Sequence, residues 1–134
     1  MEAKNDFERF MEVRKAASDE FIKGNVEPLK RISAARPPAT IFGPKGDCVL
    51  GAEEVNAANA NGVRHFGGGT NSFEIMHMSG DDQLAYWVGI QRSVVNMQGK
   101  DSPLPIDLRV TEIFRREGKD WKLIHRHADK LVSG

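Results

Sequence analysis

The chain has 134 residues, which is enough for one domain with a substantial core. Hydrophobic residues make up 40% and charged residues 28%, an ordinary globular mixture. Lysine plus arginine and aspartate plus glutamate both number 19, so the formal net charge is zero. A general nucleic-acid or membrane-surface binder would need a basic excess. We therefore expect a single domain over residues 1–134 with no nucleic-acid partner and no membrane partner.

The single cysteine, Cys48, limits the chemistry of the chain. One thiol excludes an intrachain disulfide and a zinc site built from several cysteines. Because Cys48 stands among apolar residues, we expect its thiol to be buried and unreactive. The charged first residues lack the apolar core of a secretory signal, and no apolar stretch reaches the ~20 residues of a membrane span. We therefore expect a cytoplasmic protein.

The first third of the chain predicts helices. Apolar residues recur at helical spacing between Asn5 and Lys23, which predicts an amphipathic helix with one apolar stripe. The stripe consists of Phe7, Phe10, Met11, Ala17 and Phe21. Gly24 favours a helix end, and a short second helix is predicted over residues 27–33.

The next segment, residues 39–51, reads ATIFGPKGDCVLG and predicts two short strands around a turn. A third helix is expected from Ala52 to about Ala60 or His65. Gly67, Gly68 and Gly69 follow, and we expect them to form a flexible joint. They do not predict a phosphate loop, because no lysine-serine or lysine-threonine pair follows and no helix begins there.

The remainder of the chain predicts strands over residues 72–78, 84–97, 104–117 and 121–131, of which the last two form a hairpin. Helices followed by a long antiparallel sheet predict an α+β fold. We expect a cone-shaped roll, with three N-terminal helices packed on a strongly curved, mostly antiparallel sheet and a cavity between them. Several strands are apolar on both faces, so we expect a second subunit to cover the convex face in a homodimer.

Five segments carry a resemblance to a known family: the opening helix, GNVEPLKRI, TIFGPKGDCVLGAEEV, AYWVGIQR and LRVTEIFRREGKDWKLIHRHAD. Together they resemble the SnoaL-like and ketosteroid-isomerase-like families of the nuclear transport factor 2 superfamily, over nearly the whole chain. The resemblance implies a cone-shaped, cystatin-like roll. The closing hairpin also resembles the association domain of calcium/calmodulin-dependent kinase, which is a scaffold. Isomerases, cyclases, dehydratases and non-catalytic binders share this fold, so the fold does not settle the function.

Strand alternation divides the last strand between two faces. One face is predicted to carry Trp121, Leu123, His125, His127 and Asp129. The other is predicted to carry Lys122, Ile124, Arg126 and Ala128. The resemblance to the kinase association domain favours the face of Arg126 as the pocket side, which leaves the histidines nearer the convex side.

Two arginines of the hairpin are candidates for binding a ligand. A guanidinium buried without a carboxylate partner is costly, so Arg126 and Arg109 would suit an anionic ligand such as a small carboxylic acid. Alternatively, these arginines pair within the sheet with Glu112, Glu74 or Asp129. Glu112 is itself a candidate for contact with the ligand.

Two aromatic residues of the central strand are further candidates for ligand binding. Tyr86 and Trp87 are adjacent in the sequence, so their side chains point to opposite faces. We expect one of them to line the pocket and the other to pack behind it, and either polar group could meet a ligand.

The histidines of the hairpin leave three readings open. His127, His125 and Asp129 are candidates for moving a proton in acid/base catalysis. The histidines could instead be structural, at a sheet or dimer interface. His-x-His on a strand can also chelate a metal, but no third ligand is evident, and we predict no metal site.

Three classes of function follow from these readings. The first is binding of a small, partly apolar organic molecule, for which an anion is one option, with cofactor-free isomerase, cyclase, dehydratase or hydrolase chemistry if the protein is an enzyme. The second is a non-catalytic binding or oligomerisation module like the kinase association domain. A metal-dependent enzyme is the third and weakest reading. The sequence does not identify the ligand.

Overall fold

The computed structural model describes residues 2–132, with side chains from Asp6 onward. This part of the chain contains the helices α1 (Glu2–Ile22), α2 (Glu27–Ile32) and α3 (Ala52–Gly62), and a short 3-10 helix, η1 (Val63–His65). Its strands are β1 (Thr40–Phe42), β2 (Cys48–Leu50), β3 (Phe66–Gly80), β4 (Leu84–Met97), β5 (Leu104–Glu117) and β6 (Asp120–Lys130).

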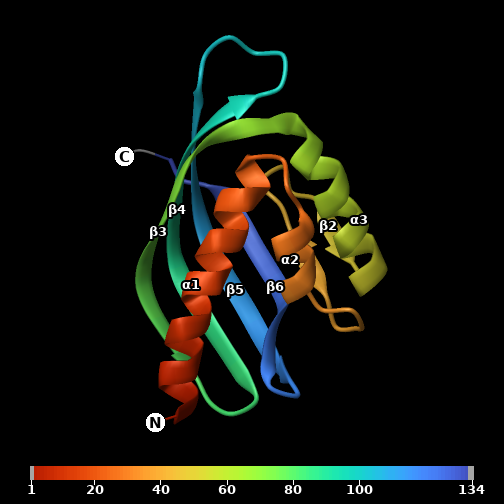
Figure 1. Ribbon diagram of the computed structural model, residues 1–134, viewed down its shortest axis with the longest axis vertical. Coiled ribbons are helices and arrows are strands. Elements are labelled where there is room, and N and C mark those ends of the chain that lie inside the picture. Colours follow the sequence, from red (N-terminus) through yellow and green to blue (C-terminus); the bar gives the residue numbers. More distant parts are fainter. Residues whose placement is uncertain (1, 133–134) are drawn as a thin grey trace.

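The strands form one curved sheet in the order β2-β1-β6-β5-β4-β3 (Figure 1). β1 runs parallel to β6, and every other neighbouring pair is antiparallel. The three helices lie on one face of this sheet, which we call the concave face, and the opposite face is the convex face. The predicted α+β architecture of helices packed on a mostly antiparallel sheet is confirmed.

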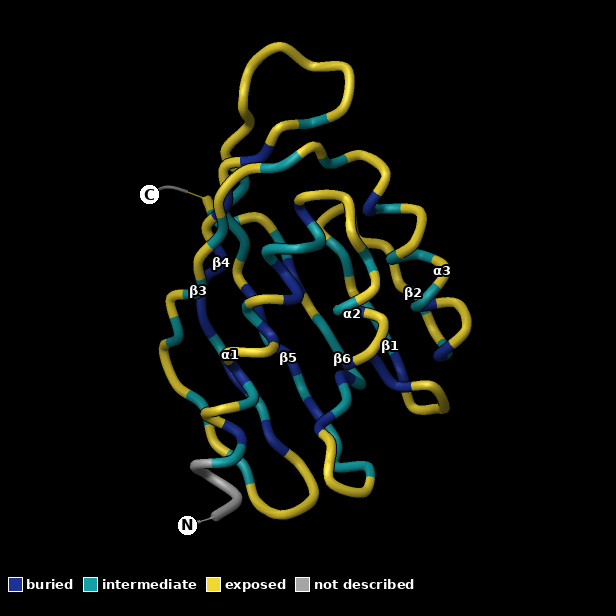
Figure 2. Tube along the Cα trace, in the orientation of Figure 1, coloured by how far each residue is buried: buried dark blue, intermediate teal, exposed yellow. Residues whose placement is uncertain are grey.

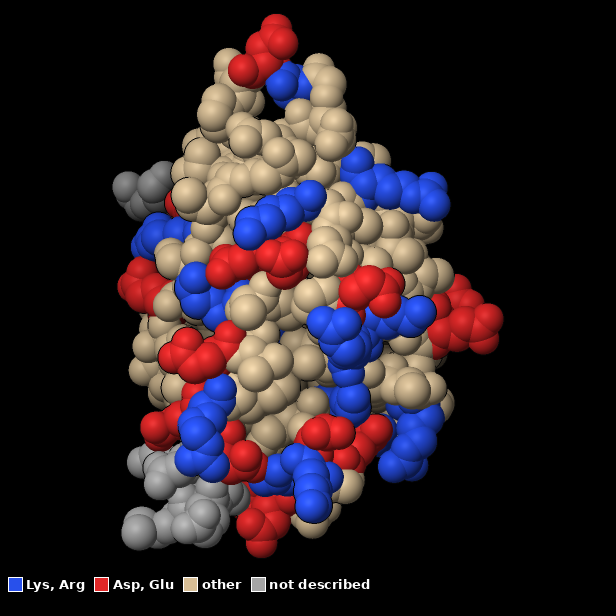
Figure 3. Space-filling view, viewed as in Figure 1, with Lys and Arg blue, Asp and Glu red and all other residues tan. Residues whose placement is uncertain are grey.

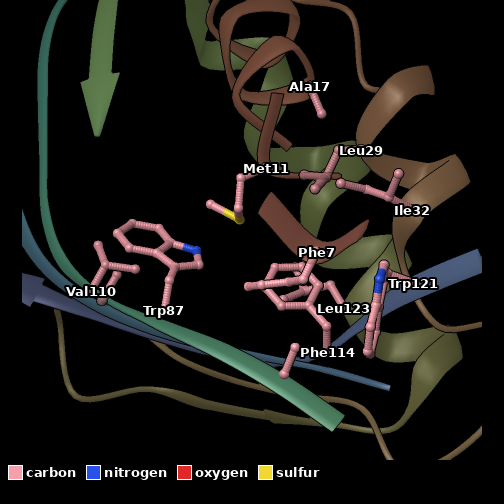
Figure 4. Packing of buried hydrophobic residues seen from close by; sticks show 12 residues of the cluster. Phe7, Met11, Ala17, Leu29, Ile32, Trp87, Val110, Phe114, Trp121 and Leu123 are labelled. Carbon is pink, nitrogen blue, oxygen red and sulfur yellow. The ribbon is translucent and has the colours of Figure 1, made fainter. Parts of the chain in front are cut away.

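The main core lies between α1 and the concave face of the sheet. Phe7 of α1 packs against Phe114 and Trp121, with ring centroids 5.4 and 5.5 Å apart (Figure 4). Trp87 and Phe114 are both fully buried in the same cluster. Figure 2 shows the buried positions running along the central strands under the helices. Burial of the stripe of α1 fixes this helix across the sheet. A space remains between its C-terminal half and the sheet.

The glycine run differs from its prediction. Residues 67–69 belong to β3 and do not form a flexible joint. Gly68 and Gly69 have φ angles of 111° and 139°, and the register with β4 shifts between Phe66 and Gly69. A side chain at Gly69 would overlap with the carbonyl oxygen of Val94. The conformational freedom of the glycines therefore allows a bulged strand to approach its neighbour closely, and it does not make the segment a joint.

The prediction that Cys48 is buried is also wrong. Its side chain is exposed, because it lies on β2 at the edge of the sheet.

A β-bulge changes which residues of β6 share a face. Leu123 pairs with Phe114 and His125 pairs with Ile113, so Ile124 is an extra residue with no partner of its own. Beyond the bulge the alternation is reversed. Trp121 and Leu123 therefore lie on the concave face with Arg126 and Ala128. Strict alternation predicted instead that they share a face with His125, His127 and Asp129, and this prediction is wrong.

On the helical side of the molecule, neither positive nor negative charge predominates. Acidic and basic side chains are interleaved over it (Figure 3). Of the helices in the described part of the chain, none has the length and apolar character needed to cross a membrane.

Candidate functional site: a cavity with a buried ion cluster

A cavity of about 150 Å³ lies between α1, α3 and the concave face of the sheet. Most of its wall is apolar and includes Phe21, Ile22, Val55, Phe66, Leu108 and Leu123. One side is polar and is formed by Arg14, Ser18, Gln91, Ser93 and Arg126. An apolar enclosure with a few converging polar groups is the usual form of a small-molecule site.

An ion cluster stands behind the polar side of the cavity, with Glu112 at its centre. The Glu112 side chain has no exposed surface. Arg14 donates Nε to Oε1 at 2.8 Å and Nη2 to Oε2 at 2.7 Å, which is a bidentate pair. Arg126 donates Nη1 to Oε2 at 2.7 Å, and Trp87 donates Nε1 to Oε1 at 2.8 Å. The carboxylate thus accepts four hydrogen bonds from three side chains.

The cluster stabilises the charged form of its carboxylate. Burial alone would raise the pKa of Glu112, but the charges and hydrogen bonds of Arg14 and Arg126 outweigh this and lower it to about 2. Two guanidinium groups therefore face one carboxylate, and the cluster keeps a net charge of +1. Nη1 of Arg14 is buried and has no hydrogen-bond partner among the described residues.

Gln91 connects the ion cluster to a second polar layer. Its Oε1 accepts a hydrogen bond from Nη2 of Arg126 at 2.7 Å. Its Nε2 donates to Oγ of Ser18 at 3.1 Å and to Oδ1 of Asn71 at 2.9 Å. Ser93 donates to the same Asn71 oxygen at 3.1 Å. These contacts hold Gln91 and Arg126 in fixed orientations at the cavity wall.

α1 contributes two of the polar groups that the sequence analysis missed. Arg14 and Ser18 are four residues apart, so they lie on the same face of the helix, toward the sheet. A signal was present in the sequence, because Arg14 stands three residues after Met11 and three before Ala17, within the apolar stripe. Gln91 and Ser93 carried a similar signal as polar residues on the inward parity of an otherwise apolar strand.

His125 lies at the edge of the cavity, where β1 meets β6. Its Nδ1 is 2.6 Å from Oγ1 of Thr40, and its ring packs edge-on against Phe42 at 5.0 Å. Burial lowers the pKa of His125, and the nearby His127 lowers it further. The imidazole is therefore predominantly neutral near pH 7.

The structure divides the candidate residues of the hairpin between two faces. The prediction that Arg126 faces the cavity is confirmed, and its pairing with Glu112 confirms the alternative of an ion pair within the sheet. Arg109 lies on the convex face, where its side chain is 63% exposed and binds Asp129 through bonds of 2.6 and 2.8 Å. The prediction that Arg109 joins Arg126 in the cavity is therefore wrong.

Two of the candidate proton carriers also lie on the convex face. His127 is 48% exposed and approaches Asp129 at 3.5 Å. Asp129 accepts hydrogen bonds from Arg109, which lower the pKa of its carboxyl group. Neither residue lines the cavity, because the bulge in β6 places both on the side away from the helices.

The two aromatic candidates occupy opposite faces of β4, as predicted, but neither lines the cavity. Trp87 is fully buried, stacks on Phe73 with ring centroids 4.7 Å apart, and donates a hydrogen bond from Nε1 to Glu112. Tyr86 lies on the convex face, where its hydroxyl is 3.2 Å from Nδ1 of His77. The prediction that one of the two lines the pocket is wrong, because the indole of Trp87 packs in the core and donates its hydrogen bond to Glu112.

Metal ligands do not gather anywhere in the described part of the chain. No three histidine, cysteine, aspartate or glutamate side chains there are close enough to share one ion.

The fold and its cavity define a class of cone-shaped α+β proteins, and solved structures of this class are similar to the chain. A protein from Streptomyces avermitilis, assigned as a dehydratase of the nuclear transport factor 2-like family, superposes with a TM-score of 0.82 at 17% identity, covering 96% of this chain and 98% of the other. A protein from Thiobacillus denitrificans, assigned as a calcium/calmodulin-dependent protein kinase type II association domain, gives 0.71 at 16% identity, covering 90% and 93%.

A nuclear transport factor 2-like superfamily protein from Salmonella enterica gives a TM-score of 0.76 at 11% identity, covering 96% of this chain and 92% of the other. At such identities the likeness shows the fold alone. No curated protein matches the sequence. The sequence profile of the SnoaL-like domain matches residues 11–130, and the chain therefore belongs to the SnoaL-like family.

Proposed function

We propose that this protein binds a small, partly apolar organic anion, most simply a carboxylate, in the cavity between α1 and the sheet. The observation that carries the proposal is the imbalance of the ion cluster. Arg14 and Arg126 share the single carboxylate of Glu112, and Nη1 of Arg14 is buried with no hydrogen-bond partner in the described part of the chain. A buried charge and a buried donor left unpaired are costly, and a bound carboxylate would satisfy both.

The size of the cavity supports a ligand of modest size. A dry cavity of roughly 150 Å³ in another protein accommodates benzene. The volume of about 150 Å³ found here therefore fits a body the size of one aromatic ring. The apolar wall would cover that body while the guanidinium groups hold the charge.

A thermal-shift experiment with benzoate and its neutral analogue benzamide tests the proposal. Benzoate should raise the melting temperature by several degrees, because a ligand at 100 times its dissociation constant adds roughly 2.7 kcal/mol of stability. Benzamide should have a much smaller effect. Arg126→Met should abolish the benzoate shift, whereas Arg109→Met, which removes an exposed arginine from the convex face, should preserve it. Equal shifts in both variants would contradict the proposal.

Non-catalytic binding is the simpler form of this function. Among the lining residues, His125 has an imidazole that is predominantly neutral near pH 7, because burial lowers its pKa. Glu112, behind the wall, is held as a carboxylate by four hydrogen bonds. A proton donor and a proton acceptor within reach of each other are therefore not assembled on the wall. This arrangement supports a binding module more than an acid/base enzyme.

A cofactor-free acid/base enzyme is the second candidate, and His125 favours it. Its neutral imidazole at the cavity edge, bonded to Thr40, could accept a proton from a bound ligand. An enolisable keto acid such as phenylpyruvate should then exchange hydrogen for deuterium faster with the protein than without it. His125→Gln should remove this acceleration and His77→Gln should retain it. Exchange at the background rate in all three proteins would leave binding as the function.

We also infer a homodimer through the convex face and a cytoplasmic location. The exposed thiol of Cys48 supports the second inference, because an exposed free cysteine is best preserved in a reducing compartment.

A further inference from the structure

The buried carboxylate of Glu112 joins Arg14, Trp87 and Arg126, and it also lowers the positive charge available to an anion. Replacing such an ion cluster by apolar residues is often neutral or stabilising, so stability alone is a weak reason for it. We propose that Glu112 determines the charge selectivity of the cavity, restricting it to singly charged anions such as monocarboxylates. This inference rests on the proposed function, because it presumes that the cavity binds an anion.

The first argument is the charge balance at the binding surface. Arg14 and Arg126 contribute two positive charges, and Glu112 removes one of them at distances of 2.7–2.8 Å. One further negative charge completes the neutralisation. A second negative charge on the ligand would have no partner, and it would be brought toward the carboxylate of Glu112 in a medium that screens charges weakly.

The second argument is geometric. Glu112 occupies Nε and Nη2 of Arg14 and Nη1 of Arg126, while Gln91 occupies Nη2 of Arg126. Two guanidinium nitrogens of this cluster take no part in these hydrogen bonds: Nη1 of Arg14, which is buried and has no partner among the described residues, and Nε of Arg126. Few donors remain for a ligand, which suits the two oxygens of one carboxylate better than the three oxygens of a phosphonate dianion.

The third argument is that the charge of the cluster is constant over a wide pH range. The pKa of Glu112 is lowered to about 2 by the two arginines, so this carboxylate remains ionised throughout the neutral range. Selectivity can therefore be measured by changing the charge of the ligand while the charge of the cluster stays fixed.

Phenylphosphonate is the probe for this experiment, because it is a monoanion in mildly acidic solution and a dianion in mildly basic solution. Its affinity for the wild-type protein should fall by roughly tenfold or more when the monoanion loses its second proton and becomes the dianion. Benzoate, a monoanion at both pH values, is the control, and any change in its affinity measures the effect of protonating His125 at the cavity edge. The fall in phenylphosphonate affinity is taken relative to benzoate at each pH. Titration calorimetry at each pH gives the two dissociation constants.

Two variants attribute the selectivity to the cluster. Glu112→Gln raises the net charge to +2 and should remove or reverse the preference for the monoanion. Arg14→Gln lowers it to zero and should make benzamide bind at least as tightly as benzoate. Circular dichroism establishes that each variant is folded, and the wild-type and Arg14→Gln measurements decide the question even if Glu112→Gln does not fold.

The outcomes separate this inference from the function on which it rests. If benzoate binds, but the protein has the same affinity for the monoanion and the dianion of phenylphosphonate, the charge selectivity is overturned and the anion site remains. The same holds if Glu112→Gln or Arg14→Gln folds and retains the wild-type preference. If neither benzoate nor phenylphosphonate binds at either pH, both proposals fail together.

Discussion

Glu112 concentrates several effects in one side chain, and its protonation should be visible in the stability of the protein. Its pKa in the folded state is about 2, against an ordinary value of 4.5 that applies when the chain is unfolded. The depressed value means that the ionised carboxylate stabilises the fold above pH 4.5, and that this contribution is lost as the pH falls through about 2. A difference of this size corresponds to about 3 kcal/mol.

Urea unfolding between pH 6 and pH 2 measures that loss. The wild-type free energy of unfolding should fall more steeply in this window than that of Glu112→Gln, which cannot take up the proton. Other carboxylates titrate in both proteins, so the difference between the two curves isolates Glu112. Parallel curves would show that the carboxylate is not stabilised in the way the structure indicates.

Trp87 offers a single-bond test of the same cluster. Trp87→Phe retains an aromatic ring to stack on Phe73 but removes the Nε1 donor that binds Glu112 at 2.8 Å. Loss of a hydrogen bond to a buried charge should cost about 1.5–3 kcal/mol, in addition to the packing lost with the larger ring. Tyr86→Phe is the control, because it removes an exposed hydrogen bond to His77 and should change stability by less than about 0.5 kcal/mol. Equal effects would contradict the assigned roles.

The elements of the fold were largely predictable from the sequence, whereas the site was predictable only in part. The stripe of α1 and the long alternating strands have strong periodic patterns, so their type and order could be derived. The bulge at Ile124 could not, because an extra residue in a ladder is a property of the pairing and leaves no local pattern. That one residue decides that Trp121 and Arg126 share a face.

The polar side of the cavity was missed for a related reason. Arg14 occupies a position in the apolar stripe of α1, and its partner Glu112 is 98 residues away in the chain. Neither residue indicates the other in a single sequence. Arg126 was placed correctly only because the resemblance supplied an orientation for the last strand. Arg109 was misplaced because its parity relative to Arg126 depends on the register of the hairpin.

Close packing of β3 and β4 makes a sharp prediction at the level of the strands. A side chain at Gly89 would overlap with the carbonyl oxygen of Glu74, next to the second bulge in β3. Gly89→Ala should therefore force the two strands apart and cost about 2–4 kcal/mol, within the range of severe single substitutions. Gly62→Ala is the matched control at the end of α3, where the new methyl group would meet Phe21 at 3.6 Å, an ordinary contact.

The control should behave in the opposite direction. Alanine in a helical position at Gly62 is expected to stabilise the protein by about 0.5–1 kcal/mol, because it restricts the unfolded chain. Thermal melts of both variants measure the two effects. A neutral Gly89→Ala would show that the strands are more widely spaced than the structure indicates.

The whole molecule uses the two faces of its sheet differently. The concave face is covered by helices and contains the core, the ion cluster and the cavity. The convex face carries partly buried apolar and hydroxyl side chains at its centre, among them Val88, Thr111 and Ile113. Exposed ion pairs flank them, Arg92 with Glu74 and Arg109 with Asp129. An apolar centre within a polar rim is the usual anatomy of a protein interface.

This division predicts a homodimer that a single charge on the convex face should break. The wild-type protein should sediment at about twice the chain mass of 14.9 kDa, and Ile113→Glu should sediment as a monomer because the dimer would bury an unpaired carboxylate on both sides of its two-fold axis. Val13→Glu is the control, since Val13 is 52% exposed on α1, on the other side of the molecule, and its substitution should leave the dimer intact. Analytical ultracentrifugation over a range of concentrations distinguishes these states. A wild-type monomer at tens of micromolar, or dissociation by Val13→Glu alone, would show that the convex face is not where two copies meet.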